Sequence, residues 1–165
     1  MFCVVQVAKA MEYLASKFIL HSDLAARNVL LSTMGQGAGA PLVAKVGDFG
    51  LSRPFYQRSY VKTLEGVGLP FQWLAPEFFK SGEFYLSSDV WSYGVLFWEM
   101  FSLGQCPYGD NVTYENVKAR LLVEGKYLEC PTDPILGSPS NDWFTEKVLF
   151  NLKRITHCTM PHNFF

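Results

Sequence analysis

Three short stretches decide how this chain of 165 residues is interpreted: H-S-D-L-A-A-R-N at residues 21–28, D-F-G at residues 48–50 and A-P-E at residues 75–77. The aspartate of the first precedes the aspartate of the second by 25 positions, and the glutamate of the third follows after 29 more. A lone D-F-G is a weak signal. Three motifs in this order, followed by an apolar segment over residues 89–103, are a highly specific signal.

The composition is that of a folded chain with little charge. Hydrophobic residues make up 49%, aromatic residues 16% and charged residues 18%, which excludes a disordered chain. One domain, or one lobe of a larger one, is expected at this length. The net charge of −1 excludes binding to nucleic acid through bulk positive charge. Residues 1–82 hold eight Lys/Arg against five Asp/Glu, so an anionic ligand would bind in this half.

Cysteines and apolar runs indicate the compartment. The four cysteines lack any C-x-x-C pair, which argues against a disulfide framework or a zinc site and favours a reducing compartment. Lys9 and Glu12 interrupt the first apolar stretch, so no signal peptide is predicted. The apolar block 90–103 is too short to span a bilayer and contains Glu99. No membrane span is expected within this chain.

Hydrophobic periodicity predicts a mainly helical chain with one β-hairpin and one long loop. The apolar segment 89–103 should be a buried helix, with Asp89 capping its free amides. The expected elements are helices over residues 4–18, 89–103, 111–124 and 144–155, strands within 19–31 and at 42–46, and an irregular, mobile loop over 47–72.

Three other motifs favour structural interpretations. Gly35, Gly37 and Ala40 satisfy G-x-G-x-x-A, but a β-type run follows where a dinucleotide site needs a helix. The sequon N-V-T at 111–113 coincides with a helix start and favours capping. His, Ser and Asp at 21–23 are consecutive, so their side chains diverge and cannot form a hydrolase triad.

The three opening stretches together resemble the C-terminal lobe of protein kinases, over nearly the whole chain to about Cys158. More narrowly, A-A-R-N at 25–28 and L-P-F-Q-W-L-A-P-E at 69–77 resemble tyrosine kinases of receptor type. The resemblance implies an α+β kinase fold whose mainly α-helical C-lobe, with a short β-hairpin and a long activation loop, is this chain. Residues 1–165 would be a partial kinase domain, with the N-lobe and the final helix missing.

The implied activity is ATP-dependent phosphorylation of protein tyrosine by the parent kinase. By this resemblance Asp23 accepts the proton of the tyrosine hydroxyl, and Arg27 holds hydroxyl and phosphate together. Asn28 and Asp48 provide hard oxygen ligands for Mg²⁺, and Leu30 packs beneath the adenine. The catalytic set is thus Asp23, Arg27 and Asn28, and the ATP-binding set adds Leu30 and Asp48.

Other residues receive structural or regulatory roles from the resemblance. Asp89 would brace the catalytic-loop backbone, and Glu77 would pair with a buried arginine near the end of the domain. Tyr56 and Tyr60 are candidates for activation-loop phosphorylation, with exposed loop aromatics as the alternative. The structural set is His21, Phe49, Gly50, Glu77 and Asp89.

The resemblance also implies tyrosine-bearing protein substrates, a location on the cytoplasmic side, and a parent that is a single-pass plasma-membrane receptor and allows dimerisation. One departure from the family pattern is Ser22, which stands where kinases place the arginine that holds a phosphorylated loop. Arg53 and Arg58 are the candidates to replace that arginine. The alternative is a catalytically incomplete fragment or pseudokinase acting as a protein-binding scaffold. Retention of Asp23, Asn28 and Asp48 together argues against it, because a scaffold needs no metal ligands.

Overall fold

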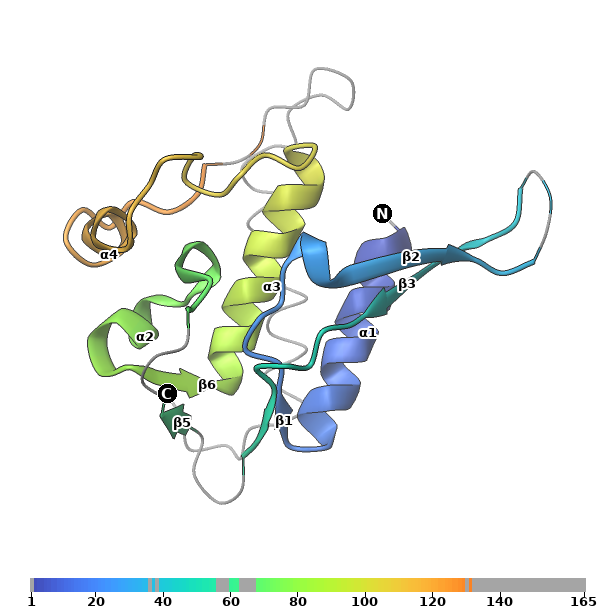
Figure 1. Cartoon of the computed structure of the whole chain (residues 1–165), viewed down its shortest axis with the longest axis horizontal. Coiled ribbons are helices and arrows are strands. Elements are labelled where there is room, and N and C mark those ends of the chain that lie inside the picture. Colours follow the sequence, from blue (N-terminus) through green and yellow to red (C-terminus); the bar gives the residue numbers. More distant parts are fainter. Residues whose placement is uncertain are drawn as a thin grey trace.

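The computed structural model describes residues 2–35, 37, 39–55, 60–62, 68–129 and 131, where helices combine with three small sheets (Figure 1). The α-helices are α1 (Phe2–Ser16), α2 (Pro76–Ser81), α3 (Leu86–Phe101) and α4 (Tyr114–Leu122). The 3-10 helices are η1 (Ala26–Asn28) and η2 (Phe71–Trp73). The strands are β1 (Ile19–Leu20), β2 (Val29–Thr33), β3 (Leu42–Val46), β4 (Arg53–Pro54), β5 (Tyr60–Lys62) and β6 (Glu83–Tyr85). The fold is therefore mixed α+β.

The main core forms where α1 packs against α3. Apolar residues at three- and four-residue steps place Val7, Met11 and Leu14 on one buried face of α1. This face joins Leu96 and Phe97 of α3 in a single cluster. The predicted amphipathic and buried helices are thus confirmed, and they provide the rigid support for the loop that follows α1.

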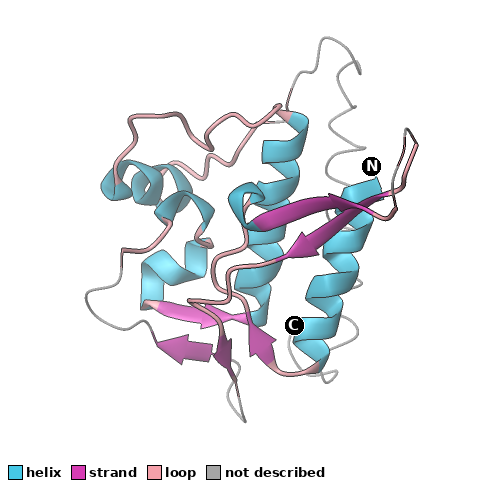
Figure 2. Ribbon diagram, turned by 45° about the vertical axis from the view of Figure 1, so that its right-hand side comes forward, coloured by secondary structure: helices cyan, strands magenta, loops and turns pink. Residues whose placement is uncertain are grey.

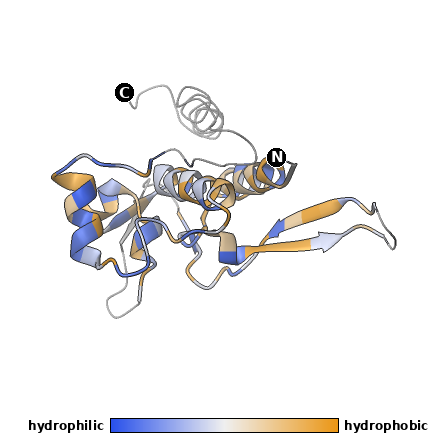
Figure 3. Ribbon diagram, turned by 90° about the horizontal axis from the view of Figure 1, so that it is seen from above, coloured by the Kyte–Doolittle hydropathy of each residue, from blue (hydrophilic) through white to orange (hydrophobic). Residues whose placement is uncertain are grey.

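Strands β2 and β3 form an antiparallel hairpin that projects from the helices (Figures 1 and 3). Their register runs from Val29 opposite Val46 to Thr33 opposite Leu42. Gln6 of α1 fastens the hairpin, because its Oε1 accepts a 2.6 Å hydrogen bond from the backbone N–H of Ala44. The glycine-rich run lies in the hairpin connection and is followed by β3, where a dinucleotide fingerprint needs a helix.

The expectation of a wholly irregular loop over residues 47–72 was wrong at its end, where η2 begins at Phe71, and at two strands within it. Strand β4 pairs with β1, and β5 pairs with β6, so two further two-stranded sheets form within the described residues (Figure 2). The physical reason is that backbone N–H and C=O groups need hydrogen-bond partners. Short extended segments find these partners on neighbouring strands, which the local sequence pattern does not reveal. The loop is therefore tied to the body at both of these strands.

A second core cluster joins η2, α2, β6 and α4, with Phe78, Phe84 and Val117 among its buried members. Helix α4 begins at Tyr114, later than expected, because Thr113 is its N-cap and accepts a 3.2 Å hydrogen bond from the Asn116 backbone N–H. N-V-T therefore supplies the cap through Thr113, two residues after the expected helix start at Asn111. The expected helix over 144–155 lies outside the described residues.

Burial of Tyr93 predicts alkaline destabilisation. Its side chain is 1% exposed and its hydroxyl donates to the Val4 carbonyl at 3.2 Å, and burial raises its pKa from 10.0 to about 12. Above pH 10 the unfolded chain loses this proton first, so ionisation favours unfolding. The stabilising contribution is complete below pH 10 and is lost as the pH rises to 12, at about 1.4 kcal/mol per pH unit.

The measurement is urea unfolding between pH 9 and pH 12. Tyr93→Phe should show a shallower pH dependence than the wild type. The pKa of Tyr108 is also raised to about 12, so the variant keeps part of the slope. An identical slope in Tyr93→Phe and wild type would contradict the prediction.

Candidate active site

The segment between β1 and β2 gathers three side chains of the first motif. Arg27 donates through Nη2 to Oδ1 of Asp23. Asn28 donates through Nδ2 to Oδ2 of Asp23 at 3.0 Å and to the Asp23 backbone carbonyl at 2.7 Å. Helix η1 brings these residues within reach because its tight turn folds Arg27 and Asn28 back over Asp23. The Asp23 carboxylate, 14% exposed, is thus held at both oxygens.

The Arg27 guanidinium is oriented from a second side. It lies over the indole ring of Trp73 in η2, with the Arg27 Cζ atom 4.4 Å from the ring centroid. Such a cation–π contact restricts the guanidinium while leaving its N–H groups available to acceptors. Arg27 is 43% exposed along its side chain, so a substrate anion can reach it.

Asp89 anchors the start of this loop from within α3. Its two carboxylate oxygens accept hydrogen bonds from the backbone N–H groups of His21 at 2.7 Å and Ser22 at 2.9 Å. The expectation that Asp89 caps its own helix was wrong, since α3 begins at Leu86 and Asp89 lies inside its first turn. Burial raises the pKa of Asp89. The hydrogen bonds from the two backbone amides and the charge interaction with His21 act in the opposite direction.

The buried His21 imidazole connects the loop to the D-F-G stretch. Its Nδ1 accepts from the backbone N–H of Asp23 at 3.3 Å, so the proton resides on Nε2, which donates to the Gly47 carbonyl at 3.1 Å. The Phe49 ring lies with its centroid 5.2 Å from that of His21. One histidine therefore spaces the two aspartate-bearing segments.

Asp48 is the residue after Gly47, whose carbonyl bonds to His21. The Gly47 N–H donates to the Asn28 carbonyl at 2.8 Å, which brings Asp48 beside the end of η1. Asp48 has a φ of +57°, and its Oδ1 accepts from the Gly50 N–H at 3.2 Å. A Cβ at Gly50 would lie 3.2 Å from that oxygen, so glycine permits the close approach.

The oxygen atoms of Asn28 and Asp48 suit a magnesium ion. Asn28 uses its amide nitrogen for Asp23, so the atom it offers to a cation is its hard carbonyl oxygen. Asp48 is exposed and supplies a carboxylate. Mg²⁺ prefers one or two such ligands together with substrate phosphates and water. Among the described residues there is no cluster of three or more His, Cys, Asp or Glu side chains suited to a metal.

The remaining predicted residues are placed as follows. Leu30 on β2 is 63% exposed, so its apolar face is open, and a Cβ added at Gly47 would lie 3.4 Å from its Cδ1. Glu77 is half-buried and its Oε1 accepts from the hydroxyls of Ser87 at 3.1 Å and Ser88 at 2.9 Å.

Tyr56 lies outside the described residues. Tyr60 lies in β5, opposite Tyr85.

Ser22 adopts the left-handed conformation with a φ of +64° and is 6% exposed. Within the described part of the chain its hydroxyl has no hydrogen-bond partner. Of its suggested substitutes, Arg53 lies in β4 opposite Leu20, two residues from Ser22. Arg58 lies outside the described residues.

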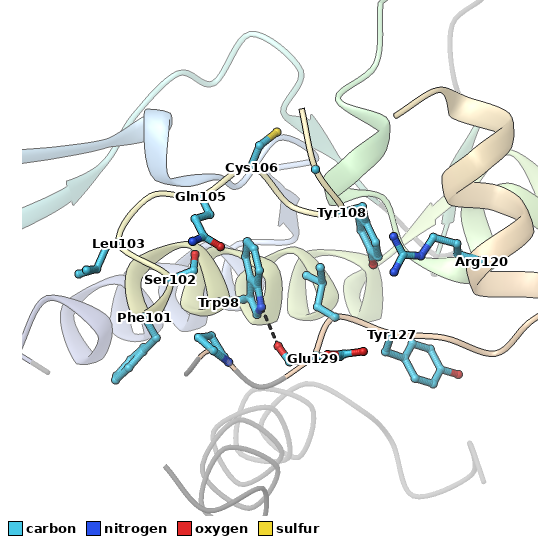
Figure 4. Close-up of a pocket in the computed structure, with 13 residues that line it drawn as sticks. Trp98, Phe101, Ser102, Leu103, Gln105, Cys106, Tyr108, Arg120, Tyr127 and Glu129 are labelled. Carbon is cyan, nitrogen blue, oxygen red and sulfur yellow. Dashed lines mark hydrogen bonds between the residues drawn. The ribbon is translucent and has the colours of Figure 1, made fainter. Parts of the chain in front are cut away.

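A cavity of about 650 Å³ lies apart from these residues (Figure 4). It is lined by the end of α3, the segment after it, α4 and residues 127–129 and 131. Figure 4 shows Trp98 donating from its indole to the Glu129 carbonyl at the rim, a 2.8 Å bond. The predicted catalytic and ATP-binding residues do not line this cavity.

Sequence reasoning missed two residues of the site, Trp73 and Glu99. Glu99 was noted only as a charge that interrupts an apolar run. Its Oε2 accepts from the Trp73 indole N–H at 2.9 Å and from the Ala26 backbone N–H at 2.9 Å. The available signal was the carboxylate itself, since a lone charge in a buried helix requires partners.

Comparison with known sequences identifies the family of this chain. Residues 1–135 match the family described as protein tyrosine and serine/threonine kinase. The chain therefore belongs to the protein kinase family.

Its similar relatives include tyrosine kinases. The chain is 43% identical to fibroblast growth factor receptor 1 of Xenopus laevis over 131 residues, which are 79% of this chain and 15% of that protein. It is 46% identical to the megakaryocyte-associated tyrosine-protein kinase of Mus musculus over 132 residues, 80% of this chain and 23% of that protein. The chain thus spans less than a quarter of the length of these curated relatives.

Proposed function

We propose that this chain is the catalytic part of a protein tyrosine kinase and transfers the γ-phosphate of ATP to tyrosine hydroxyls when it is joined to an ATP-binding lobe. The observation that carries the proposal is the Asp23 carboxylate, which Arg27 and Asn28 fix at its two oxygens, while the Asn28 carbonyl accepts from Gly47, the residue before Asp48. Kinase family membership supports the phosphotransferase role. The similarity to tyrosine kinases favours tyrosine as acceptor.

The residues present can perform the acid–base and positioning steps. Asp23 accepts the proton of the incoming tyrosine hydroxyl as the oxygen attacks phosphorus. Arg27, held by Asp23 and Trp73, presents its remaining N–H groups to the phosphate and the hydroxyl. Because phosphoryl transfer depends on alignment and charge neutralisation, fixed orientation of these two groups is their main contribution.

Asn28 and Asp48 would hold Mg²⁺ on the phosphates. The ion supplies neutralisation of charge on the transferred group when bound. Leu30, exposed on the projecting hairpin, would provide an apolar surface beneath the adenine. Tyr56 and Tyr60 remain candidates for phosphorylation in the segment between D-F-G and A-P-E, which we propose is the activation loop.

The parent protein is proposed to be a receptor whose kinase domain lies on the cytoplasmic side of the plasma membrane. The proposal is supported by the similarity to fibroblast growth factor receptor 1. None of the helices in the described ranges has the length and apolar character needed to cross a bilayer. Substrates would be proteins carrying tyrosine, and dimerisation would occur through the parent.

The test compares the 165-residue polypeptide with the same chain joined behind the glycine-rich-loop lobe of an active tyrosine kinase. Both are incubated with Mg-ATP and a tyrosine peptide. The joined protein should phosphorylate the peptide. The polypeptide alone should show negligible transfer, because residues 1–165 contain no V-A-I-K lysine to clamp the phosphates.

Two outcomes would contradict these expectations. Turnover by the polypeptide alone that Asp23→Ala abolishes would show that residues 1–165 suffice. A folded joined protein that transfers no phosphate would contradict the proposed activity and favour the scaffold alternative suggested by Ser22. A melting shift of that protein with Mg-ATP would then report nucleotide binding without transfer.

A further inference from the structure

Glu99 is a buried carboxylate with two partners in different segments. It lies near the end of α3 and is 8% exposed. One oxygen, Oε2, accepts from both the Ala26 backbone N–H and the Trp73 indole N–H, each at 2.9 Å. Glu99 therefore joins the loop that carries Asp23 to the segment that precedes A-P-E.

The two bonds converge on Arg27. Ala26 is its neighbour in η1, so the bond to Glu99 fixes the backbone from which Arg27 extends. Trp73 supplies the ring that lies 4.4 Å from the Arg27 guanidinium. A continuous set of contacts thus runs from Glu99 through Trp73 and Arg27 to Asp23.

The geometry requires a strong acceptor at Glu99. An indole N–H has a single direction in which to donate, so its bond to Oε2 sets the rotation of the ring on which Arg27 lies. Hydrogen bonds to a charged acceptor are stronger than those to a neutral one. An amide at this position would accept more weakly and would introduce two buried donors that need partners of their own.

We propose that Glu99 is a positioning residue for phosphate transfer, which sets the orientation of Arg27 through Trp73 and Ala26. The proposal rests on the proposed kinase function. Glu99 forms no hydrogen bond or ion pair with Asp23 or Arg27, so its effect on the reaction is transmitted through the indole ring and the η1 backbone. Loss of Glu99 should lower kcat more than it raises the KM for ATP.

The first experiment needs no turnover and uses the full 165-residue chain labelled with ¹⁵N. The chain has four tryptophans, and Trp73→Phe identifies the Trp73 indole signal by its disappearance. In Glu99→Gln the Trp73 indole N–H should shift upfield and exchange with solvent at least tenfold faster. The Arg27 side-chain N–H signal should also move, because the ring current acting on it changes.

The second experiment measures kinetics in the chain joined to an ATP-binding lobe. Glu99→Gln and Trp73→Phe should each lower kcat about tenfold, and the double variant should be no slower than the slower single one, because the first weakens and the second removes the same hydrogen bond. Trp73→Phe keeps an aromatic ring under Arg27 and leaves the buried carboxylate in place, so it serves if Glu99→Gln does not fold. Tyr93→Phe is the matched control: it removes another buried hydrogen bond from α3, and its partner Val4 lies away from the loop.

The outcomes separate the two proposals. An unchanged Trp73 indole signal in Glu99→Gln, or an unchanged kcat in folded Glu99→Gln and Trp73→Phe, would overturn the positioning role. Equal losses of kcat in Tyr93→Phe and Glu99→Gln would also overturn it, since they would reflect stability of α3 alone. Absence of turnover in the wild-type joined protein contradicts the kinase function instead, and the Glu99 contact is then judged by the indole signal.

Discussion

Replacement of Asp23 by asparagine is expected to lower phosphate transfer by the joined kinase about 10²–10⁴-fold, the range that general-base catalysis contributes. Asparagine has nearly the same shape, but its amide oxygen does not accept the proton of a tyrosine hydroxyl. It also presents an NH₂ group to one of the two donors, on Arg27 and Asn28, that hold the carboxylate. The loss should appear in kcat, measured with Mg-ATP and a tyrosine peptide.

Stability provides the control for this variant. The Asp23–Arg27 pair is partly exposed, and such pairs contribute about 0–1 kcal/mol, so urea unfolding of Asp23→Asn should stay close to that of the wild type. Asp110→Asn, a change at an exposed carboxylate in another loop, should leave kcat unchanged. Retention of wild-type kcat in Asp23→Asn would exclude Asp23 as the base.

Replacement of Asp89 by alanine is expected to reduce the free energy of unfolding by about 3–5 kcal/mol. Asp89 is 6% exposed, and its removal leaves the backbone N–H groups of His21 and Ser22 buried without their acceptors. Each unsatisfied buried group costs about 1–3 kcal/mol, and a cavity adds to this. Because an ordinary domain is stable by about 5–15 kcal/mol, the chain should lose much of its stability.

The measurement is urea unfolding of the 165-residue chain with Asp89→Ala, Asp89→Asn and, as a surface control, Asp110→Ala. Asp89→Asn keeps one acceptor oxygen and should lose less than the alanine variant. Asp110→Ala should change stability by no more than about 0.5 kcal/mol. If Asp89→Ala were as stable as Asp110→Ala, the carboxylate would not anchor the loop.

The sequence predicted most of the helical core and the hairpin. Val7, Met11 and Leu14 recur at helical spacing, and their burial follows from that period alone. The hairpin was predictable because an apolar, β-branched run follows a glycine-rich connection. Strands β4 and β5 could not be predicted in the same way, because two or three extended residues carry no period and acquire regular structure only from partners distant in sequence.

The sequence named the residues that meet at the candidate site, but it did not reveal the buried carboxylate that anchors their loop. Asp23, Arg27 and Asn28 stand within six residues, so their motif is local and a tight turn suffices to gather them. Asp89 was expected to cap its helix, and only the packing of α3 against the loop showed that its carboxylate is used 67 and 68 positions away. The role of Tyr56 stays a prediction.

By itself the sequence determined which chemical groups this protein has available: two carboxylates, a guanidinium and an amide in a fixed order along the chain. Only the tertiary structure decided what holds them, namely Asp89 beneath His21 and Ser22, and Glu99 beneath Ala26 and Trp73. The reason is that a buried carboxylate must find donors, and which donors it meets depends on how α3 packs rather than on its neighbours in sequence.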